Sequence, residues 1–148
     1  MTLIQEMLEV ARPLDDVFAF VGDFANTKHW DPGVAEARKI TEGPVRSGTR
    51  FELEVVFNGR RLPMTYEVET WDRPNRVVLR GEGSTVRAVD DIRFEHVPGG
   101  TQIHYSADLR LKGPLRLLEP LLRKRFDETG RAAMAGMRRA LQLRAHQA

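Results

Sequence analysis

The dipeptide Asn58-Gly59 separates two stretches in which apolar and polar residues alternate. A two-residue turn at this point fixes the register of the flanking strands, and that register must keep the apolar side chains on one face. With this turn, apolar residues fall opposite one another, as the pairs Val55 with Leu62, Leu53 with Met64, and Phe51 with Tyr66. The other face is polar, so the sequence predicts an antiparallel hairpin with one buried face.

The same test extends the sheet beyond this hairpin. A turn at Pro98-Gly99 places further apolar residues opposite one another, as the pairs Phe94 with Ile103, Ile92 with Tyr105, and Ala88 with Leu109. It also places Asp90 opposite Ala107, on the apolar face. A loop over residues 72–75 sets Val68 against Leu79 and Thr70 against Val77. We therefore expect one continuous inner face along an antiparallel meander.

Helical periodicity marks the two ends of the chain. After a strand over residues 2–10, Pro13 suits a first helical turn, and in the short helix that follows Val17, Phe18 and Val21 share a face. A second short helix is predicted over residues 24–30. A long helix over residues 120–145 would span about 39 Å, which is enough to lie across the sheet.

The apolar stripe on the inner side of this long helix consists of small residues in its middle. It runs through Leu122, Phe126, Gly130, Ala133 and Met137. A glycine in a helix interior costs about 1 kcal/mol relative to alanine, and Gly136 lies in the same segment. Either a close approach to the sheet or an open space must offset this cost.

Length and composition exclude several classes of protein. The 148 residues and the hydrophobic content of 41% suit a single domain over residues 1–148. The absence of cysteine excludes disulfides, thiolate catalysis and cysteine-bound metal centres, and it fits a reducing compartment such as the cytoplasm. We expect no secretory signal and no transmembrane segment, because no long apolar run is present.

Positive charge is concentrated toward the C-terminus. Residues 112–148 hold 9 Lys and Arg against 3 Asp and Glu, a balance of +6, whereas residues 1–111 hold 14 against 18, a balance of −4. Arg116, Arg123, Arg131 and Arg138 recur at helical spacing, which is typical of the solvated face of an amphipathic helix. No aromatic residues alternate with them, so we expect no nucleic-acid partner.

Three segments resemble a known family, namely residues 12–32 (RPLDDVFAFVGDFANTKHWDP), 71–80 (WDRPNRVVLR) and 94–109 (FEHVPGGTQIHYSADL). Together with the order of the predicted elements, they resemble the START-like or SRPBCC superfamily, in its polyketide cyclase/dehydrase-like branch. The resemblance implies an α+β helix-grip fold, in which a curved, antiparallel, seven-stranded sheet wraps around the long C-terminal helix. It also implies a cavity between sheet and helix for an apolar or amphipathic molecule. The three segments mark the fold and not an activity.

The consecutive residues His29, Trp30 and Asp31 allow two interpretations. In an active site, His29 would act as a general base oriented by Asp23 or Asp31. In a packed corner, Trp30 closes the end of the sheet, His29 faces water, and Asp31 is extended because proline follows it. We favour the corner, because neighbours in sequence point to different sides of a helix.

Asp90 is the strongest single candidate for chemistry or recognition. An ionisable group on an apolar face is costly to bury unless it is paired. The alternative is a β-bulge at Asp90-Asp91 that turns the side chain to solvent. Tyr66 and Tyr105 could donate hydrogen bonds to a ligand, or they could be core residues with satisfied hydroxyls.

The candidate ligand-binding residues combine the inner face with the helix stripe. They are Phe51, Leu53, Tyr66, Asp90, Ile92, Tyr105, Leu122, Phe126, Gly130 and Met137. No catalytic residue is assigned and no cofactor is expected. A metal site is not predicted either, because His96 and His104 fall in the outward register without a third ligand at suitable spacing.

Three functions remain open at the level of sequence. The first is a carrier or sensor that holds a small hydrophobic molecule, such as a lipid or a polyketide. The second is a cyclase or dehydratase that moves protons with Asp90, Tyr66 or Tyr105. The third is an interaction module that uses the basic helix face. The open edges of such a sheet also allow a homodimer.

Overall fold

The structure, a computed structural model, describes residues 2–147 and the side chains of residues 2–142. Its strands are β1 (Thr2–Val10), β2 (Val34–Lys39), β3 (Arg50–Phe57), β4 (Arg60–Asp72), β5 (Arg76–Glu82), β6 (Val86–Val97) and β7 (Gly100–Leu111). Its helical segments are α1 (Leu14–Gly22), η1 (Phe24–Asn26), α2 (Thr27–Trp30), η2 (Gly113–Leu118) and α3 (Glu119–Gln147), where η denotes a 3-10 helix. The second predicted short helix therefore consists of η1 followed by α2.

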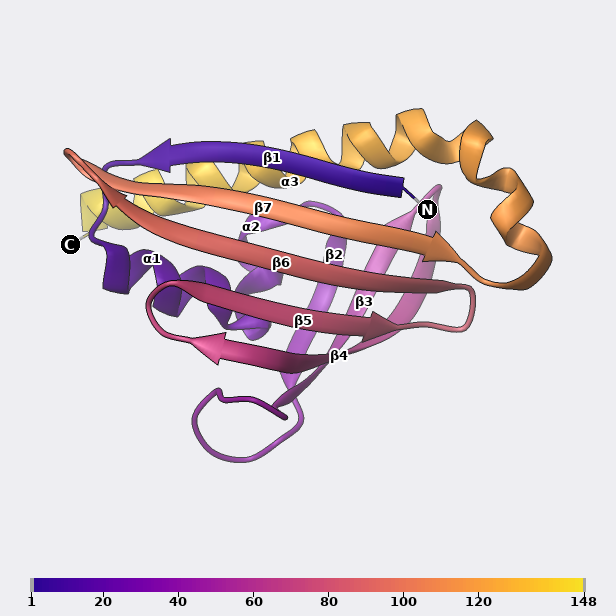
Figure 1. Cartoon of the computed structure of the whole chain (residues 1–148), viewed down its shortest axis with the longest axis horizontal. Helices are drawn as coiled ribbons and strands as arrows, with labels where there is room; N and C mark the ends of the chain where they lie inside the picture. The colour runs from indigo at the N-terminus through magenta and orange to yellow at the C-terminus, as the bar shows by residue number, and fades with distance from the viewer. Residues whose placement is uncertain (1, 148) are drawn as a thin grey trace.

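The strands of the described chain form one antiparallel sheet in the order β1-β7-β6-β5-β4-β3-β2. Figure 1 shows β2 and β3 running steeply across the direction of β5, β6 and β7, so that the sheet curves. The helix α3 packs along β1 and extends over the length of the sheet. The predicted seven-stranded sheet, short helices and long C-terminal helix are confirmed, and the arrangement is a helix-grip fold.

The register predicted for the two hairpins is confirmed. Phe51 lies opposite Tyr66 and Leu53 opposite Met64 in the β3–β4 pair. On the outer face of the same pair, Arg50 donates a hydrogen bond to Glu67 over 2.8 Å. In the β6–β7 pair, Asp90 lies opposite Ala107 as expected. The turn residues and the alternation of apolar side chains thus define the sheet together.

One predicted pair, Thr70 with Val77, is wrong. The register of β4 against β5 shifts between Val68 and Thr70, so that Thr70 pairs with Val78 and Trp71 with Val77. The extra residue on β4 forms a bulge, which bends the strand and turns Trp71 toward α1. The indole of Trp71 packs on Phe18 with ring centroids 4.7 Å apart.

The apolar core fills only one end of the inner face. There α1, η1 and α2 cover the sheet, and Phe18 packs edge-on against Phe94 with centroids 5.1 Å apart. Phe24 lies against Phe51 at a centroid distance of 6.4 Å. At the other end the covering elements are η2 and the first turns of α3 (Figure 1). The sheet is therefore not filled uniformly, and this difference positions the site described below.

The two interior glycines of α3 are explained by close approach. A β-carbon on Gly136 would lie 2.0 Å from the backbone oxygen of Trp30, and one on Gly130 would lie 2.6 Å from a methyl carbon of Ile4. The first contact joins α3 to the end of α2, and the second joins it to β1. The helix-propensity cost of each glycine is therefore offset by packing that a larger residue would prevent.

We predict that Gly136→Ala lowers the free energy of unfolding by about 2 kcal/mol, because the added methyl group meets a backbone atom that cannot rotate away. Gly130→Ala should cost less, since the end of the Ile4 side chain can move and alanine favours the helix. Urea unfolding of the two variants measures the difference. A Gly136→Ala protein as stable as the native protein would contradict the close packing of α3 on α2.

Candidate ligand-binding site

A cavity of about 470 Å³ lies between the inner face of the sheet and α3. Its walls are mainly apolar and come from β3, β4, β6, β7 and the first half of α3. This volume falls within the range of about 300–1,000 Å³ that is usual for small-molecule sites. The helix α1 does not line the cavity, whereas Phe24 of η1 and Thr27 and Trp30 of α2 border it.

The mouth of the cavity lies at the β3–β4 hairpin and η2. Among the lining residues, those classed as exposed are Asn58, Arg60, Leu115 and Leu118. The first two belong to the hairpin and its turn, and the last two belong to η2. Behind them, the rings of Phe57 and Phe126 stack with centroids 4.8 Å apart.

The inner end of the cavity is polar. The innermost lining residue, counted along each strand from the mouth, is Tyr66 on β4, Asp90 on β6 and Tyr105 on β7. Asp31, which follows α2, lines the same end, as does Trp30. The indole of Trp30 meets the ring of Tyr105 edge-on at a centroid distance of 6.2 Å. Its nitrogen is buried and has no hydrogen-bond partner within the described chain.

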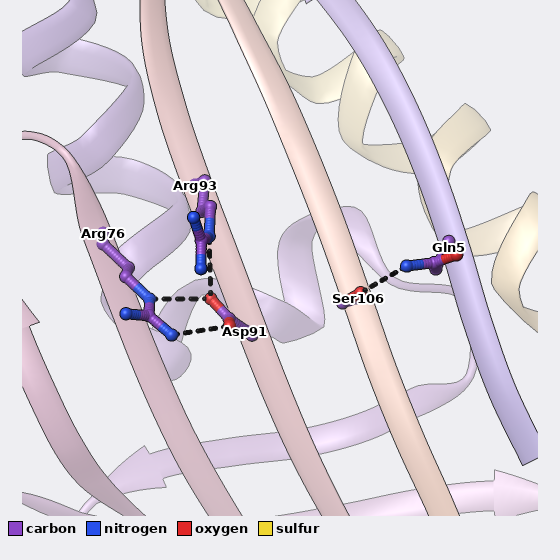
Figure 2. Close-up of polar contacts among 5 residues, drawn as sticks. All are labelled: Gln5, Arg76, Asp91, Arg93 and Ser106. Atoms are coloured by element: carbon purple, nitrogen blue, oxygen red, sulfur yellow. Dashed lines mark hydrogen bonds and ion pairs between the residues drawn. The ribbon is translucent and has the colours of Figure 1, made fainter.

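Asp90 points into the cavity because β6 pairs regularly on both sides. It lies opposite Leu79 on β5 and Ala107 on β7, so the bulge that would have turned it outward is absent at this position. The side chain is 7% exposed and accepts a hydrogen bond from the hydroxyl of Tyr105. Asp91, its neighbour, faces the outer surface instead. Asp91 accepts two hydrogen bonds from Arg76, as Figure 2 shows. The Nε atom of Arg93 lies 3.8 Å from the same carboxylate.

Burial makes the acidic groups of this cluster hard to ionise. Desolvation raises the pKa of Asp90 to about 7, with the nearby Asp31 acting in the same direction, while the hydrogen bond from Tyr105 lowers it. Desolvation likewise raises the pKa of Asp31 to about 6, against the lowering effect of the hydrogen bond from the Gly33 amide. Burial and the two carboxyls raise the pKa of Tyr66 and Tyr105 well above its ordinary value. Both hydroxyls therefore stay protonated at neutral pH.

Tyr66 is positioned by a glycine on the next strand. Gly81 lies opposite Tyr66, and a β-carbon on Gly81 would come within 2.6 Å of the tyrosine ring. The ring can therefore lie flat over β5, where Phe24 contacts its edge at a centroid distance of 5.3 Å. Its hydroxyl group is thereby held near the carboxyls of Asp90 and Asp31, whose charges act on it.

The corner interpretation of His29, Trp30 and Asp31 agrees with the geometry of all three residues. His29 is exposed and Trp30 is 3% exposed, so the two do not form one site. Asp31 has the expected extended backbone, and in addition its half-buried carboxyl lines the cavity and accepts a hydrogen bond from the Gly33 amide over 2.8 Å. Sequence reasoning also missed Glu6, which lines the cavity from β1. The alternation of β1, with Ile4 and Leu8 inside, could have placed Glu6 on the inner face.

Seven of the ten predicted binding residues line the cavity, namely Leu53, Tyr66, Asp90, Tyr105, Leu122, Phe126 and Gly130. Phe51, Ile92 and Met137 do not line it and are fully buried in the core. On its own strand or helix, each of the three is the next residue on the inner face after a lining residue, in the direction away from the mouth. These three residues therefore form the packed floor of the cavity. A role in ligand binding stays a prediction for all ten.

Neither a metal cluster nor a membrane span emerges from the described residues. They contain no group of three or more His, Asp or Glu side chains placed to hold a metal ion. None of the helices among them is long and apolar enough to cross a bilayer.

The curved sheet, the gripping helix and the cavity between them define a START-like helix-grip protein. The sequence matches the family described as polyketide cyclase / dehydrase and lipid transport over residues 1–142. The chain therefore belongs to this family. None of the curated proteins matches the sequence.

Solved structures share the fold at low sequence identity. A protein from Thermus thermophilus superposes with a TM-score of 0.81 at 21% identity, covering 95% of this chain and 97% of its own. A START superfamily protein from Mycobacterium smegmatis has a TM-score of 0.81 at 16% identity, with coverage of 97% and 99%. An aromatase/cyclase from a Streptomyces species has a TM-score of 0.75 at 16% identity, with coverage of 98% and 93%. Because these identities are low, the structures support the fold alone.

We predict that Asp90→Asn becomes more stable relative to the native protein as the pH rises. The pKa of Asp90 is higher in the folded than in the unfolded chain, so its favourable contribution is complete below about pH 4 and is lost by about pH 7. Asparagine carries no such penalty. The gain from pH 4.5 to pH 8 should reach a few kcal/mol, since one pKa unit corresponds to about 1.4 kcal/mol.

Urea unfolding at several pH values measures this gain. The matched control is Asp91→Asn on the outer face, which should be less stable than the native protein at pH 8 because it loses its contacts with Arg76 and Arg93. If Asp90→Asn showed the same pH dependence as the native protein, Asp90 would not be a desolvated carboxyl in the folded chain.

Proposed function

We propose that this protein binds a small hydrophobic or amphipathic molecule in the cavity between sheet and helix. The observation that carries the proposal is a ligand-sized apolar cavity that ends in a cluster of hydrogen-bonding groups. Apolar walls favour the body of the ligand, and the polar inner end favours one defined orientation. The family description names lipid transport, which is consistent with this use.

The charges that line the cavity support a ligand that is not an acid. The cavity is lined by three carboxyl groups, those of Glu6, Asp31 and Asp90. Within the described part of the chain its one basic lining residue is Arg60, which is exposed at the mouth. A carboxylate at the inner end would meet further acidic groups in a medium of low polarity. A ligand that ends in a hydroxyl, a carbonyl or an amine avoids this repulsion between negative charges. A ligand oxygen at the inner end could also accept a hydrogen bond from the indole nitrogen of Trp30.

A second candidate function is proton-transfer chemistry on a bound polycarbonyl compound. It is favoured by one specific observation, the hydrogen bond between Tyr105 and a buried Asp90 whose pKa lies near neutrality. A group with such a pKa can both accept and donate a proton at neutral pH. One structural neighbour is an aromatase/cyclase.

Cytoplasmic location and a homodimer through an open sheet edge also remain predictions from the sequence.

Binding is tested with the neutral fluorescent probe N-phenyl-1-naphthylamine and a displacement series at pH 8. Decanol and decylamine should displace the probe, and decanoate should require a concentration at least about tenfold higher, because its charge is repelled at the inner end. Ala107→Leu, which fills the cavity, should weaken probe binding about tenfold or more.

Ser106→Leu is the matched control for this variant, because Ser106 directly precedes Ala107 on β7 and accepts a hydrogen bond from Gln5 on the outer face (Figure 2). It should leave probe binding unchanged. Equal binding by native protein and Ala107→Leu would place the probe elsewhere. Displacement by decanoate as effective as by decanol would reject the charge selectivity while leaving the cavity in use.

The enzymatic candidate is tested with Asp90→Asn and a linear polycarbonyl substrate. Loss of the proton-transfer group should reduce turnover by about 100-fold or more, while the affinity for N-phenyl-1-naphthylamine changes little. Undiminished turnover in Asp90→Asn, or none in the native protein, would leave ligand binding as the function.

A further inference from the structure

The mouth of the cavity is surrounded by leucine side chains that the fold leaves in water. Leu117 is 76% exposed and Leu121 is 77% exposed, and these are the largest exposed fractions among the large hydrophobic residues of the described chain. Leu115 and Leu118 are partly exposed and line the cavity from the same segment. Figure 1 shows this segment, η2 and the first turns of α3, projecting from one end of the molecule.

The spacing of these leucines places them on two different sides of the segment. Leu118 and Leu122 are four residues apart and line the cavity, so they belong to the inner side of the segment. Leu117 and Leu121 are also four residues apart, but they lie on the outer side and contribute nothing to the core. An exposed apolar pair beside the opening of an apolar cavity is typical of an interaction surface.

The same segment is positively charged. Between residues 112 and 125 the basic residues are Lys112, Arg116, Arg123, Lys124 and Arg125. The one acidic residue in this range, Glu119, is 6% exposed, and its carboxylate accepts a hydrogen bond from the Leu111 amide over 2.8 Å. Acidic residues resume at Asp127 and Glu128.

Most of these positive charges are available to a partner. Lys112 is paired with Glu82 at 2.7 Å, and Arg125 donates a hydrogen bond to Asn58 of the hairpin. Within the described chain, Arg116, Arg123 and Lys124 are exposed and lie within ion-pair distance of no acidic side chain. The exposed leucines are thus flanked by unneutralised basic groups on both sides.

We propose that η2 and the start of α3 dock the protein on an anionic membrane surface, with Leu117 and Leu121 inserted among the acyl chains. Leucines in the interface and basic side chains at the level of the headgroups are the pattern of a membrane-surface helix. Docking in this orientation turns the cavity mouth toward the bilayer, so an apolar ligand could pass between the two without crossing water. Membrane docking is a function separate from ligand binding, and the docking surface could act even if the cavity held no ligand.

The test is co-sedimentation of the purified protein with vesicles of phosphatidylcholine alone and with phosphatidylglycerol added. The native protein should bind the anionic vesicles, and binding should fall steeply when salt is raised to about 0.5 M. The double variant Leu117→Ser/Leu121→Ser should bind the anionic vesicles about tenfold more weakly or worse. The variant Arg123→Gln/Lys124→Gln should bind less and depend less on salt.

The matched control is Leu3→Ser/Met7→Ser, which removes two apolar residues of β1 that are 49% and 57% exposed on the outer face. It should leave vesicle binding unchanged. Binding of N-phenyl-1-naphthylamine without vesicles shows that each variant is folded and that the cavity is intact, so failure of docking is distinguishable from failure of ligand binding.

Two results would overturn the proposal. One is native protein that stays in solution with anionic vesicles, or binds them as well after Leu117→Ser/Leu121→Ser. The other is sedimentation equilibrium showing a native dimer that this variant converts to a monomer, which would assign the leucines to a protein interface.

Discussion

The position of α3 over the sheet determines the rest of the structure. Two glycines let the helix backbone touch the Trp30 carbonyl and the Ile4 side chain, so the middle of α3 is fixed on α2 and β1. Beyond these contacts, toward the mouth, α1 and α2 no longer fill the space under the helix. The sheet curves around that space, and a cavity of about 470 Å³ remains. Close contact in one half of the helix and open space in the other are thus two results of the same packing.

The boundary between the filled and the open half is also where the chemistry is concentrated. The buried Asp90 accepts a hydrogen bond from the partly buried Tyr105 there, with Asp31 close enough to raise the pKa of Asp90. On the outer face, one residue further along β6, Asp91 is neutralised by arginines (Figure 2). Strand alternation therefore places two adjacent carboxyls in opposite environments, one at the inner end of the apolar cavity and the other paired with arginines on the outer face.

Most of the fold could be predicted from the sequence, because turns at Asn58-Gly59 and Pro98-Gly99 fix registers that the apolar pattern can check. The bulge after Val68 could not, since an extra residue in a strand has no turn signal. For the site, the residues of the inner face could be predicted, but how far packed side chains fill the space between sheet and helix could not. Phe51, Ile92 and Met137 have the pattern of wall residues and lie in the floor, because tertiary packing decides where a cavity ends. Asp31 had no periodic signal at all.

We propose that the space between sheet and helix receives a ligand. A crystal structure of the protein with N-phenyl-1-naphthylamine tests it most directly. We expect electron density for the probe between Leu53, Leu109 and Phe126, with its nitrogen directed toward Asp90. A structure in which Phe57 and Phe126 have closed into the space, with the probe bound elsewhere, would contradict it.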